Sequence, residues 1–169
     1  MIKYIWLVPV FPLIGFLING LFGKRISKHT VSLVGPASVG LSFALVLASF
    51  WEYIHLPATA KPVEVFVFNW ITSGKFNAQA AFLVDPLSLI MLMVVSGVGF
   101  LIHIYSVGYM HDDPGYPRYF SYLNLFVVNM LLLVMANNFL LMFVGWEGVG
   151  LCSYLLIGFW YEKKSASDA

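Results

Sequence analysis

Residues 139–161 read FLLMFVGWEGVGLCSYLLIGFWY, and the only charged side chain among them is Glu147. A helix rises about 1.5 Å per residue, so about 20 apolar residues cross the roughly 30 Å hydrocarbon core of a bilayer. This stretch is therefore expected to span a membrane with Glu147 near the midplane. Inserting an acidic residue there costs roughly 2.5 to 3.5 kcal/mol, and intramembrane acids usually mark a proton or ion pathway.

The whole chain has the composition of an integral membrane protein. Of its 169 residues, 60% are hydrophobic and 10% are charged. The mean hydropathy of +0.86 is too high for a soluble domain of this length. The formal net charge of +1 offers no basic or acidic surface for nucleic acid or an acidic partner. The single cysteine, Cys152, cannot build a disulfide framework or a cysteine-based metal site in this chain.

Four further apolar segments of similar length precede residues 139–161 in the chain. We therefore predict an all-α integral membrane protein with five transmembrane helices in a single membrane domain that covers residues 1–169. The expected spans are residues 4–22, 31–54, 86–110, 119–135 and 139–161. Because only residues 136–138 connect the last two spans, these helices are expected to be antiparallel neighbours.

Residues 55–85, between the second and third spans, form a connection that is too long for a tight turn. Residues 63–70 alternate in part and are rich in β-branched and aromatic side chains, and residues 73–75 (Ser-Gly-Lys) supply a turn. This pattern predicts a β-hairpin on the membrane surface. An irregular loop is the alternative.

The distribution of lysine and arginine predicts the orientation of the chain in the membrane. Six basic side chains fall on one side: Lys24, Arg25, Lys28, Arg118, Lys163 and Lys164. Three fall on the other: Lys3, Lys61 and Lys75. The richer side is expected to face the cytoplasm. The N-terminus would then lie outside and the C-terminus inside, with the hairpin on the outer face.

Two titratable side chains inside the spans are candidates for proton transfer. Glu147 is either a proton site or a neutral carboxyl that bonds to a neighbouring helix, and we favour the proton site. Gly145, Gly148 and Gly150 are expected to thin the helix and to admit another helix or a water chain to the acid. His103, in the third span, is either a packing residue or a member of a proton relay.

Other polar residues near the spans are given structural roles. Asp85 stands just before Pro86 and is expected to cap the third helix. The turn after the third span is expected to cap the fourth helix without forming a metal site, and its polar residues are His111, Asp112, Asp113 and Arg118. Three asparagines are expected to hold helices together: Asn129, Asn137 and Asn138.

The sequence lacks the motifs of soluble enzymes. It contains no phosphate-binding glycine loop, no dinucleotide fingerprint, and no nucleophile with a paired base. We therefore expect this chain to bind no cofactor and no metal of its own. The energy for ion movement would have to come from another protein.

Four stretches of the chain resemble one known family: residues 82–88 (FLVDPLS), 103–110 (HIYSVGYM), 118–126 (RYFSYLNLF) and 145–159 (GWEGVGLCSYLLIGF). They are similar to the N-terminal part of the antiporter-like subunit L, or chain 5, of NADH:quinone oxidoreductase, respiratory complex I. The resemblance covers essentially the whole chain. The wider family includes the large subunits of multisubunit sodium/proton antiporters.

The resemblance implies a proton-translocating, non-redox subunit of the membrane arm, in the bacterial plasma membrane or an equivalent energy-conserving membrane. In this family a glutamate on the fifth helix, matching Glu147, pairs with a lysine on a later, broken helix. The hairpin between the second and third helices is also a family feature. NADH, flavin, iron–sulfur clusters and quinone would belong to partner subunits. The expected partners are other membrane-arm subunits and membrane lipids, and not nucleic acid.

The sequence is several times shorter than the members of this family, and it stops where a sixth helix would begin. A split gene, a truncated copy and a fragment of a longer chain would each account for this. We expect a further polypeptide to supply the remaining helices and the lysine partner of Glu147, so this chain should not translocate protons alone. Two alternative functions stay open: a sodium/proton antiporter subunit, and a structural or assembly subunit without its own ion pathway.

Overall fold

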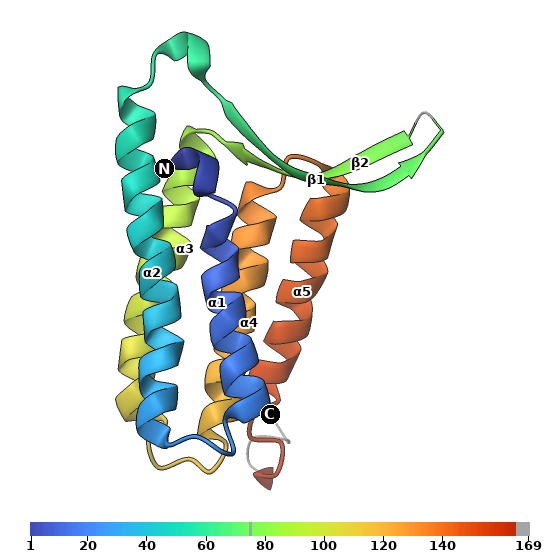
Figure 1. Cartoon of the computed structure of the whole chain (residues 1–169). Coiled ribbons are helices and arrows are strands. Elements are labelled where there is room, and N and C mark those ends of the chain that lie inside the picture. The colour runs from blue at the N-terminus through green and yellow to red at the C-terminus, as the bar shows by residue number, and fades with distance from the viewer. Residues whose placement is uncertain (75, 165–169) are drawn as a thin grey trace.

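The apolar segments form five long helices that stand side by side, and a two-stranded hairpin reaches away from one end of the bundle (Figure 1). The computed structural model describes residues 1–74 and 76–164. A 3-10 turn at Ile2–Tyr4 precedes the first helix, and a π-helical turn at Ile18–Phe22 extends it. The helices are α1 (Leu7–Leu17), α2 (Lys28–His55), α3 (Pro86–Tyr109), α4 (Tyr116–Met135) and α5 (Phe139–Ile157).

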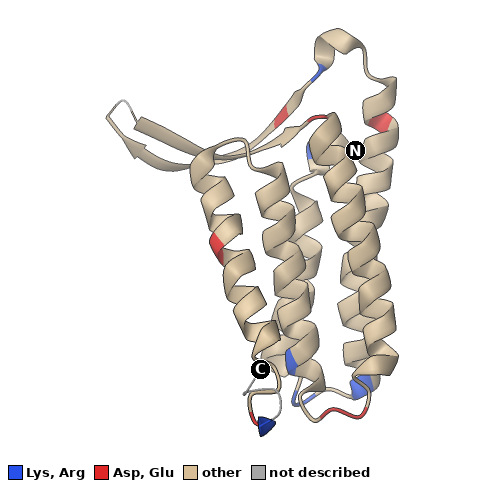
Figure 2. Cartoon of the chain, turned by 180° about the vertical axis from the view of Figure 1, so that it is seen from behind, with Lys and Arg blue, Asp and Glu red and all other residues tan. Residues whose placement is uncertain are grey.

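Five helical segments in the described part of the chain have the length and composition needed to cross a membrane. They are Ile2–Phe22, Lys28–His55, Pro86–Tyr109, Tyr116–Met135 and Phe139–Ile157. The prediction of five long apolar helices is therefore confirmed. The Lys and Arg residues lie toward the two ends of the bundle, as the blue segments in Figure 2 show.

Asp85 begins α3 as predicted. Its carboxylate accepts a hydrogen bond from the backbone N–H of Ser88 at 2.7 Å, and the Ser88 hydroxyl accepts one from the Asp85 N–H at 2.8 Å. This reciprocal capping box satisfies two backbone donors, and Pro86 has no N–H to leave unpaired in the first turn. Asn138 caps α5 in a similar way, because its side-chain oxygen accepts from the Leu141 N–H at 3.0 Å.

The turn before α4, which was expected to cap this helix, does so without a side-chain hydrogen bond. Gly115 occupies the N-cap position, and among the described residues no side chain caps this helix. Asp113 instead accepts hydrogen bonds from the Gly115 N–H and from the indole N–H of Trp160, both at 2.7 Å. Arg118 lies 4.7 Å from the centre of the Phe159 ring. The turn before α4 is therefore fastened to the segment after α5, which draws its polar side chains away from the helix start.

Helix α4 is the centre of the bundle. It contacts α1, α2, α3 and α5, and its Phe120, Asn124 and Leu131 side chains are fully buried. Helix α5 packs chiefly on α4, and the buried share of its span is 17%, against 44% for α4. The antiparallel pairing of α4 with α5 is as predicted (Figure 1). The described residues leave one face of α5 uncovered.

The predicted β-hairpin between α2 and α3 is confirmed. Strands β1 (Val63–Ser73) and β2 (Phe76–Val84) are antiparallel. The part of β2 from Gln79 onward lies against the bundle. The Asn137 N–H donates to the Ala81 carbonyl at 3.2 Å, and the Asn138 side-chain amide donates to the Gln79 carbonyl at 2.7 Å. The turn end of the hairpin extends beyond the helices (Figure 1).

Candidate functional site

Glu147 lies midway along α5, on the face that points away from α4. Residues of a helix follow one another at about 100°, so side chains four and seven positions from Glu147 lie within about 40° of it. Phe143, Leu151 and Tyr154 occupy such positions and are 59%, 55% and 75% exposed. Glu147 is exposed as well. It therefore belongs to the uncovered face of α5.

Gly145 and Gly148, the glycines beside Glu147, make room for α4 and not for a group that approaches the carboxylate. A Cβ atom added to Gly145 would come within 2.6 Å of the Leu133 backbone nitrogen, and one added to Gly148 within 2.1 Å of the Asn129 side-chain oxygen. As predicted, these two glycines admit another helix, but that helix is α4, and it packs on the side of α5 away from the carboxylate. Gly150 differs, since nothing lies within 4 Å of its added Cβ.

Glu147 takes part in none of the hydrogen bonds or ion pairs found among residues 1–74 and 76–164. The basic residues of the described chain lie toward the bundle ends, whereas α5 carries its acid at mid-length (Figure 2). A counter-charge for this carboxylate would have to be brought by residues other than these.

Asn129 joins α4 to α5 behind Glu147, as predicted for an interhelical contact. Its amide nitrogen donates to the Leu125 carbonyl at 2.9 Å and lies 3.6 Å from the Cys152 sulfur. Asn129 and Cys152 are both buried. Together with Gly145 and Gly148, they form a tight seam that fixes the rotation of α5 and thereby the direction in which Glu147 points.

His103 is fully buried inside the bundle. Its Nδ1 lies 2.7 Å from the Gly99 carbonyl oxygen, and its Nε2 lies 2.8 Å from the Asn124 side-chain oxygen. The Ser38 hydroxyl donates to the same Asn124 oxygen at 3.4 Å. His103 thus joins α3 to α4 and α2, on the side of α4 away from α5. The structure does not bring the two candidate residues, His103 and Glu147, together.

Four buried polar residues of the first, second and fourth spans were not singled out from the sequence: Asn19, Ser38, Ser121 and Asn124. Asn19 and Asn124 are asparagines within apolar spans, the same signal that drew notice to Asn129. Their relation to His103 depends on the rotation of α1 and α4, which the sequence pattern does not fix. Among the described residues, both amide atoms of Asn19 and the amide nitrogen of Asn124 have no hydrogen-bond partner.

A pocket of about 1400 Å³ opens where the end of α1, the α3–α4 turn and the segment after α5 meet. Its walls are mixed, with Lys24, Arg118 and Lys163 beside aromatic and aliphatic side chains. Asn19 and Ser121 also line it. No group of three or more His, Cys, Asp or Glu side chains suited to a metal ion occurs in the described part of the chain.

In the described residues, five apolar helices and a hairpin between the second and third of them define a helical membrane protein. Residues 70–120 match the family described as NADH-ubiquinone oxidoreductase (complex I), chain 5 N-terminus. Residues 136–169 match the family described as NADH:quinone oxidoreductase/Mrp antiporter, transmembrane.

Similar proteins carry the same names. The chain is 47% identical over 167 residues to NADH-quinone oxidoreductase subunit L of Escherichia coli, which covers 96% of this chain and 26% of that protein. It is 45% identical over 166 residues to subunit L of Mycobacterium tuberculosis, covering 98% of this chain and 26% of that protein. It is 40% identical over 162 residues to NADH-ubiquinone oxidoreductase chain 5 of Hypocrea jecorina, covering 96% of this chain and 23% of that protein. The chain is therefore homologous to the N-terminal part of complex I subunit L, or chain 5, and spans about a quarter of the length of these relatives.

Proposed function

We propose that this chain is the N-terminal part of a proton-translocating membrane-arm subunit of NADH:quinone oxidoreductase, and that Glu147 takes up and releases the proton. The observation that carries the proposal is the position of Glu147, which stands at the middle of an apolar helix on a face that the described residues leave uncovered. The homology to subunit L supports the assignment to this complex.

The proposed mechanism is reversible protonation of Glu147. In a medium of low dielectric constant, an isolated carboxylate is strongly disfavoured relative to the neutral acid. A positive charge that approaches the carboxylate stabilises the ionised form, and its withdrawal favours proton uptake. Movement of a cationic group on a partner segment would then convert a conformational signal into uptake and release. Electron transfer through NADH, flavin, iron–sulfur clusters and quinone takes place in partner subunits in this proposal.

We further propose that the chain lies in the bacterial plasma membrane, or an equivalent membrane, with the N-terminus and the hairpin on the outer side. The asymmetry in lysine and arginine supports this orientation, because the end of the bundle with Lys24, Lys28 and Arg118 is the richer in positive charge. The proton would then move between that end and the hairpin end.

A sodium/proton antiporter subunit is the second candidate function, because the family matched by residues 136–169 is described by both names. An antiporter exchanges protons for sodium without electron transfer. Sodium-free membrane vesicles separate the two candidates. Proton pumping that follows NADH oxidation and persists without sodium supports the redox-driven pump, and strict dependence on sodium supports the antiporter.

Replacement of Glu147 by Gln in the intact assembly tests the proposed proton site. In inverted membrane vesicles, we expect Glu147→Gln to lower proton pumping relative to NADH oxidation. Glu64→Gln is the matched control, because the same chemical change is made at an exposed hairpin residue outside the spans. Unchanged pumping in Glu147→Gln would refute the proposed proton site at Glu147.

A further inference from the structure

The pocket at the lysine-bearing end of the bundle reaches well into the helices. Its lining includes Asn19 and Ser121, which are only 2% and 3% exposed. At its mouth lie charged side chains, among them Lys24 and Arg118. The pocket is thus an entrance with mixed walls that leads from the charged end of the bundle to buried polar side chains at the end of the first span and on α4.

Asn19 lines this entrance from the end of the first span. It belongs to the π-helical turn Ile18–Phe22, a type of turn that is frequent at functional sites. Neither amide atom of Asn19 has a hydrogen-bond partner among residues 1–74 and 76–164, although the side chain is buried. A buried amide without partners is unfavourable, and a polar site with room for water relieves this by taking up ordered water molecules.

The polar atoms continue from Asn19 along the contact between α1 and α4. The Ser121 hydroxyl donates to the Phe16 carbonyl at 3.2 Å, and Asn124 lies three positions after Ser121 on the same face of α4. Gly15 gives Asn124 its space, because an added Cβ there would lie 2.5 Å from the Asn124 amide nitrogen. That nitrogen also has no partner among the described residues. Asn19 and Ser121 thus line the pocket, and Asn124, one turn further along α4, contacts His103; these three residues are called the row below.

The contact between Asn124 and His103 can be satisfied in two ways. The Gly99 carbonyl can only accept, so the Nδ1 atom of His103 carries a proton in either state of the ring. When the ring is neutral, Nε2 is an acceptor and the Asn124 NH₂ group must face it. When the ring is protonated, Nε2 donates to the Asn124 oxygen, as in the observed arrangement at 2.8 Å. A half-turn of the Asn124 amide converts one arrangement into the other.

We propose that water enters from the lysine-bearing end through this pocket and reaches His103 along Asn19, Ser121 and Asn124, and that the Asn124 amide turns with the protonation of Nε2. In the uptake step a hydronium ion of the water row loses one O–H bond, an Nε2–H bond forms, and a water molecule remains. The hydration of the row stands independently of the function proposed above. Its part in proton transfer rests on that function.

The test of hydration is the reactivity of cysteines placed along the row in the membrane-embedded assembly. Cys152, the chain's single cysteine, is first replaced by Ser, and Asn19→Cys or Ser121→Cys is then added. The probe is a charged, membrane-impermeant methanethiosulfonate, which reacts with a thiolate to form a mixed disulfide and release a sulfinate. Because only the thiolate reacts, the rate reports contact of the sulfur with water.

We expect Asn19→Cys and Ser121→Cys to react from the lysine-bearing face at least about tenfold faster than two control positions on α1, because a thiolate forms readily only where water is present. The controls are Val8→Cys, which is buried among apolar side chains, and Leu13→Cys, which is on the exposed apolar surface. His29→Cys, at the exposed start of α2, confirms that the reagent reaches that face. Rates equal to those of the controls, or reaction from the hairpin face alone, would overturn the proposed path.

A second pair of variants tests the part of the row in proton transfer. Asn124→Leu removes the amide that contacts His103, whereas Ser106→Ala changes a buried α3 hydroxyl that is outside the row. With NADH oxidation retained, we expect pumping per NADH to fall in Asn124→Leu and to be unchanged in Ser106→Ala. Fast labelling of Asn19→Cys together with normal pumping in Asn124→Leu would refute the relay and retain the hydrated pocket. Pumping in Glu147→Gln tests the proposed function separately. Failure of the relay at Asn124 and failure of the proton site at Glu147 are therefore distinguishable.

Discussion

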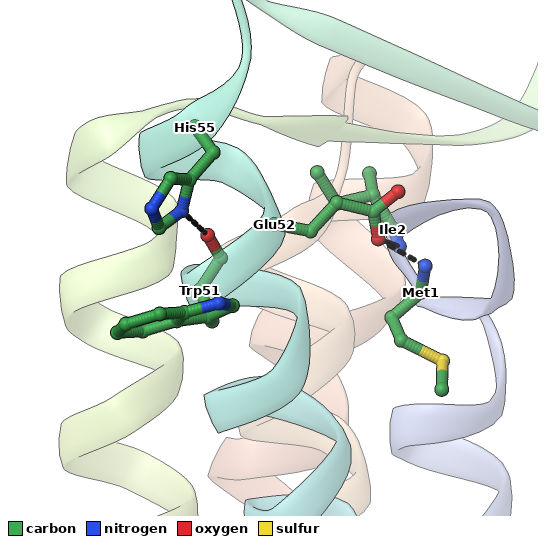
Figure 3. Close-up of polar contacts among 5 residues, drawn as sticks. All are labelled: Met1, Ile2, Trp51, Glu52 and His55. Atoms are coloured by element: carbon green, nitrogen blue, oxygen red, sulfur yellow. Dashed lines mark hydrogen bonds and ion pairs between the residues drawn. The ribbon is translucent and has the colours of Figure 1, made fainter.

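The Glu52 carboxylate of α2 accepts a hydrogen bond from the backbone N–H of Ile2 at 2.8 Å, and it also pairs with the Met1 amino group (Figure 3). Ile2 itself is buried, with 4% of its surface exposed. The carboxylate thus satisfies a backbone donor of the turn before α1, which has no side-chain cap within its own segment. This contact fixes the start of α1 against α2 near the hairpin end of the bundle.

Glu52→Ala should therefore loosen the turn before α1. Loss of one charge-assisted hydrogen bond at a partly exposed site is worth about 1 kcal/mol, which corresponds to about a fivefold loss of protection at one amide. The measurement is hydrogen–deuterium exchange at the Ile2 amide in the membrane-embedded protein. Glu64→Ala, on the hairpin, is the control and should leave that amide unchanged. Equal exchange in both variants would show that the contact contributes nothing to local stability.

The two glycines on either side of Val149 should respond differently to alanine. In Gly148→Ala the new Cβ would lie 2.1 Å from the Asn129 oxygen, so the buried Asn129 amide must move and the α4–α5 seam must open. We expect a loss of roughly 1 to 3 kcal/mol in stability, as for other overpacked sites. In Gly150→Ala nothing lies within 4 Å, and alanine favours a helix over glycine by up to about 1 kcal/mol.

The stability of both alanine variants is measured by thermal unfolding of the purified assembly in detergent. The expected order is Gly150→Ala at or above the parent protein and Gly148→Ala below it. The double variant Gly148→Ala/Asn129→Ala removes the clashing amide and should recover part of the loss. The reverse order of the two single variants would mean that α5 does not pack on α4 through Gly148.

Asp85 should tolerate Asn but not Ala. Asn and Asp are about equally good N-caps, whereas replacement of either by Ala costs typically about 1 kcal/mol. Asp85→Asn keeps the acceptor that faces the Ser88 N–H, which lies 2.7 Å away in the parent protein. Hydrogen exchange over the first turn of α3 should therefore rise in Asp85→Ala and stay unchanged in Asp85→Asn. A defect in proton pumping in Asp85→Asn, with normal exchange, would indicate a role for the charge beyond capping.

The sequence was sufficient for features that depend on nearby residues. The length and apolarity of the spans predicted the five helices, the alternating residues predicted the hairpin, and Asp85 before Pro86 predicted the cap of α3. The bonding of the turn before α4 was not predicted, because Asp113 bonds to Trp160, which is far away in the sequence. Local chemistry therefore explains the starts of α3 and α5 but not the start of α4.

The directions of the buried side chains could not be read from the sequence. Helix α5 is apolar around nearly its whole circumference, so the pattern does not tell which face packs on α4. The packing of Gly145 and Gly148 on α4 was therefore recognised only in the structure. The bond between His103 and Asn124 joins two helices whose relative rotation depends on packing throughout the bundle. For this reason, the row of polar residues became recognisable only in three dimensions.

The face of α5 that carries Glu147 should be covered by protein in the assembled complex. A photoreactive benzophenone amino acid in place of Tyr154 tests this, because Tyr154 is 75% exposed and lies about 20° from Glu147 around the helix. An isolated acid that faced lipid would be held in its neutral form, and a cationic partner can stabilise the ionised form only at close range. We therefore expect crosslinks to a protein segment that carries a lysine or arginine inside a membrane span.

Mass spectrometry of the crosslinked peptide identifies that segment, and a photoreactive residue in place of the buried Leu131 is the control that should react within this chain. Removal of each charge then tests the pairing. Replacing the identified basic residue by Gln should lower pumping about as much as Glu147→Gln does, and the double variant should be no worse than either single one, because residues that act as a unit are not additive. Crosslinks from position 154 to lipid alone would mean that Glu147 faces the bilayer. Glu147 would then be a neutral carboxyl that takes no part in proton pumping.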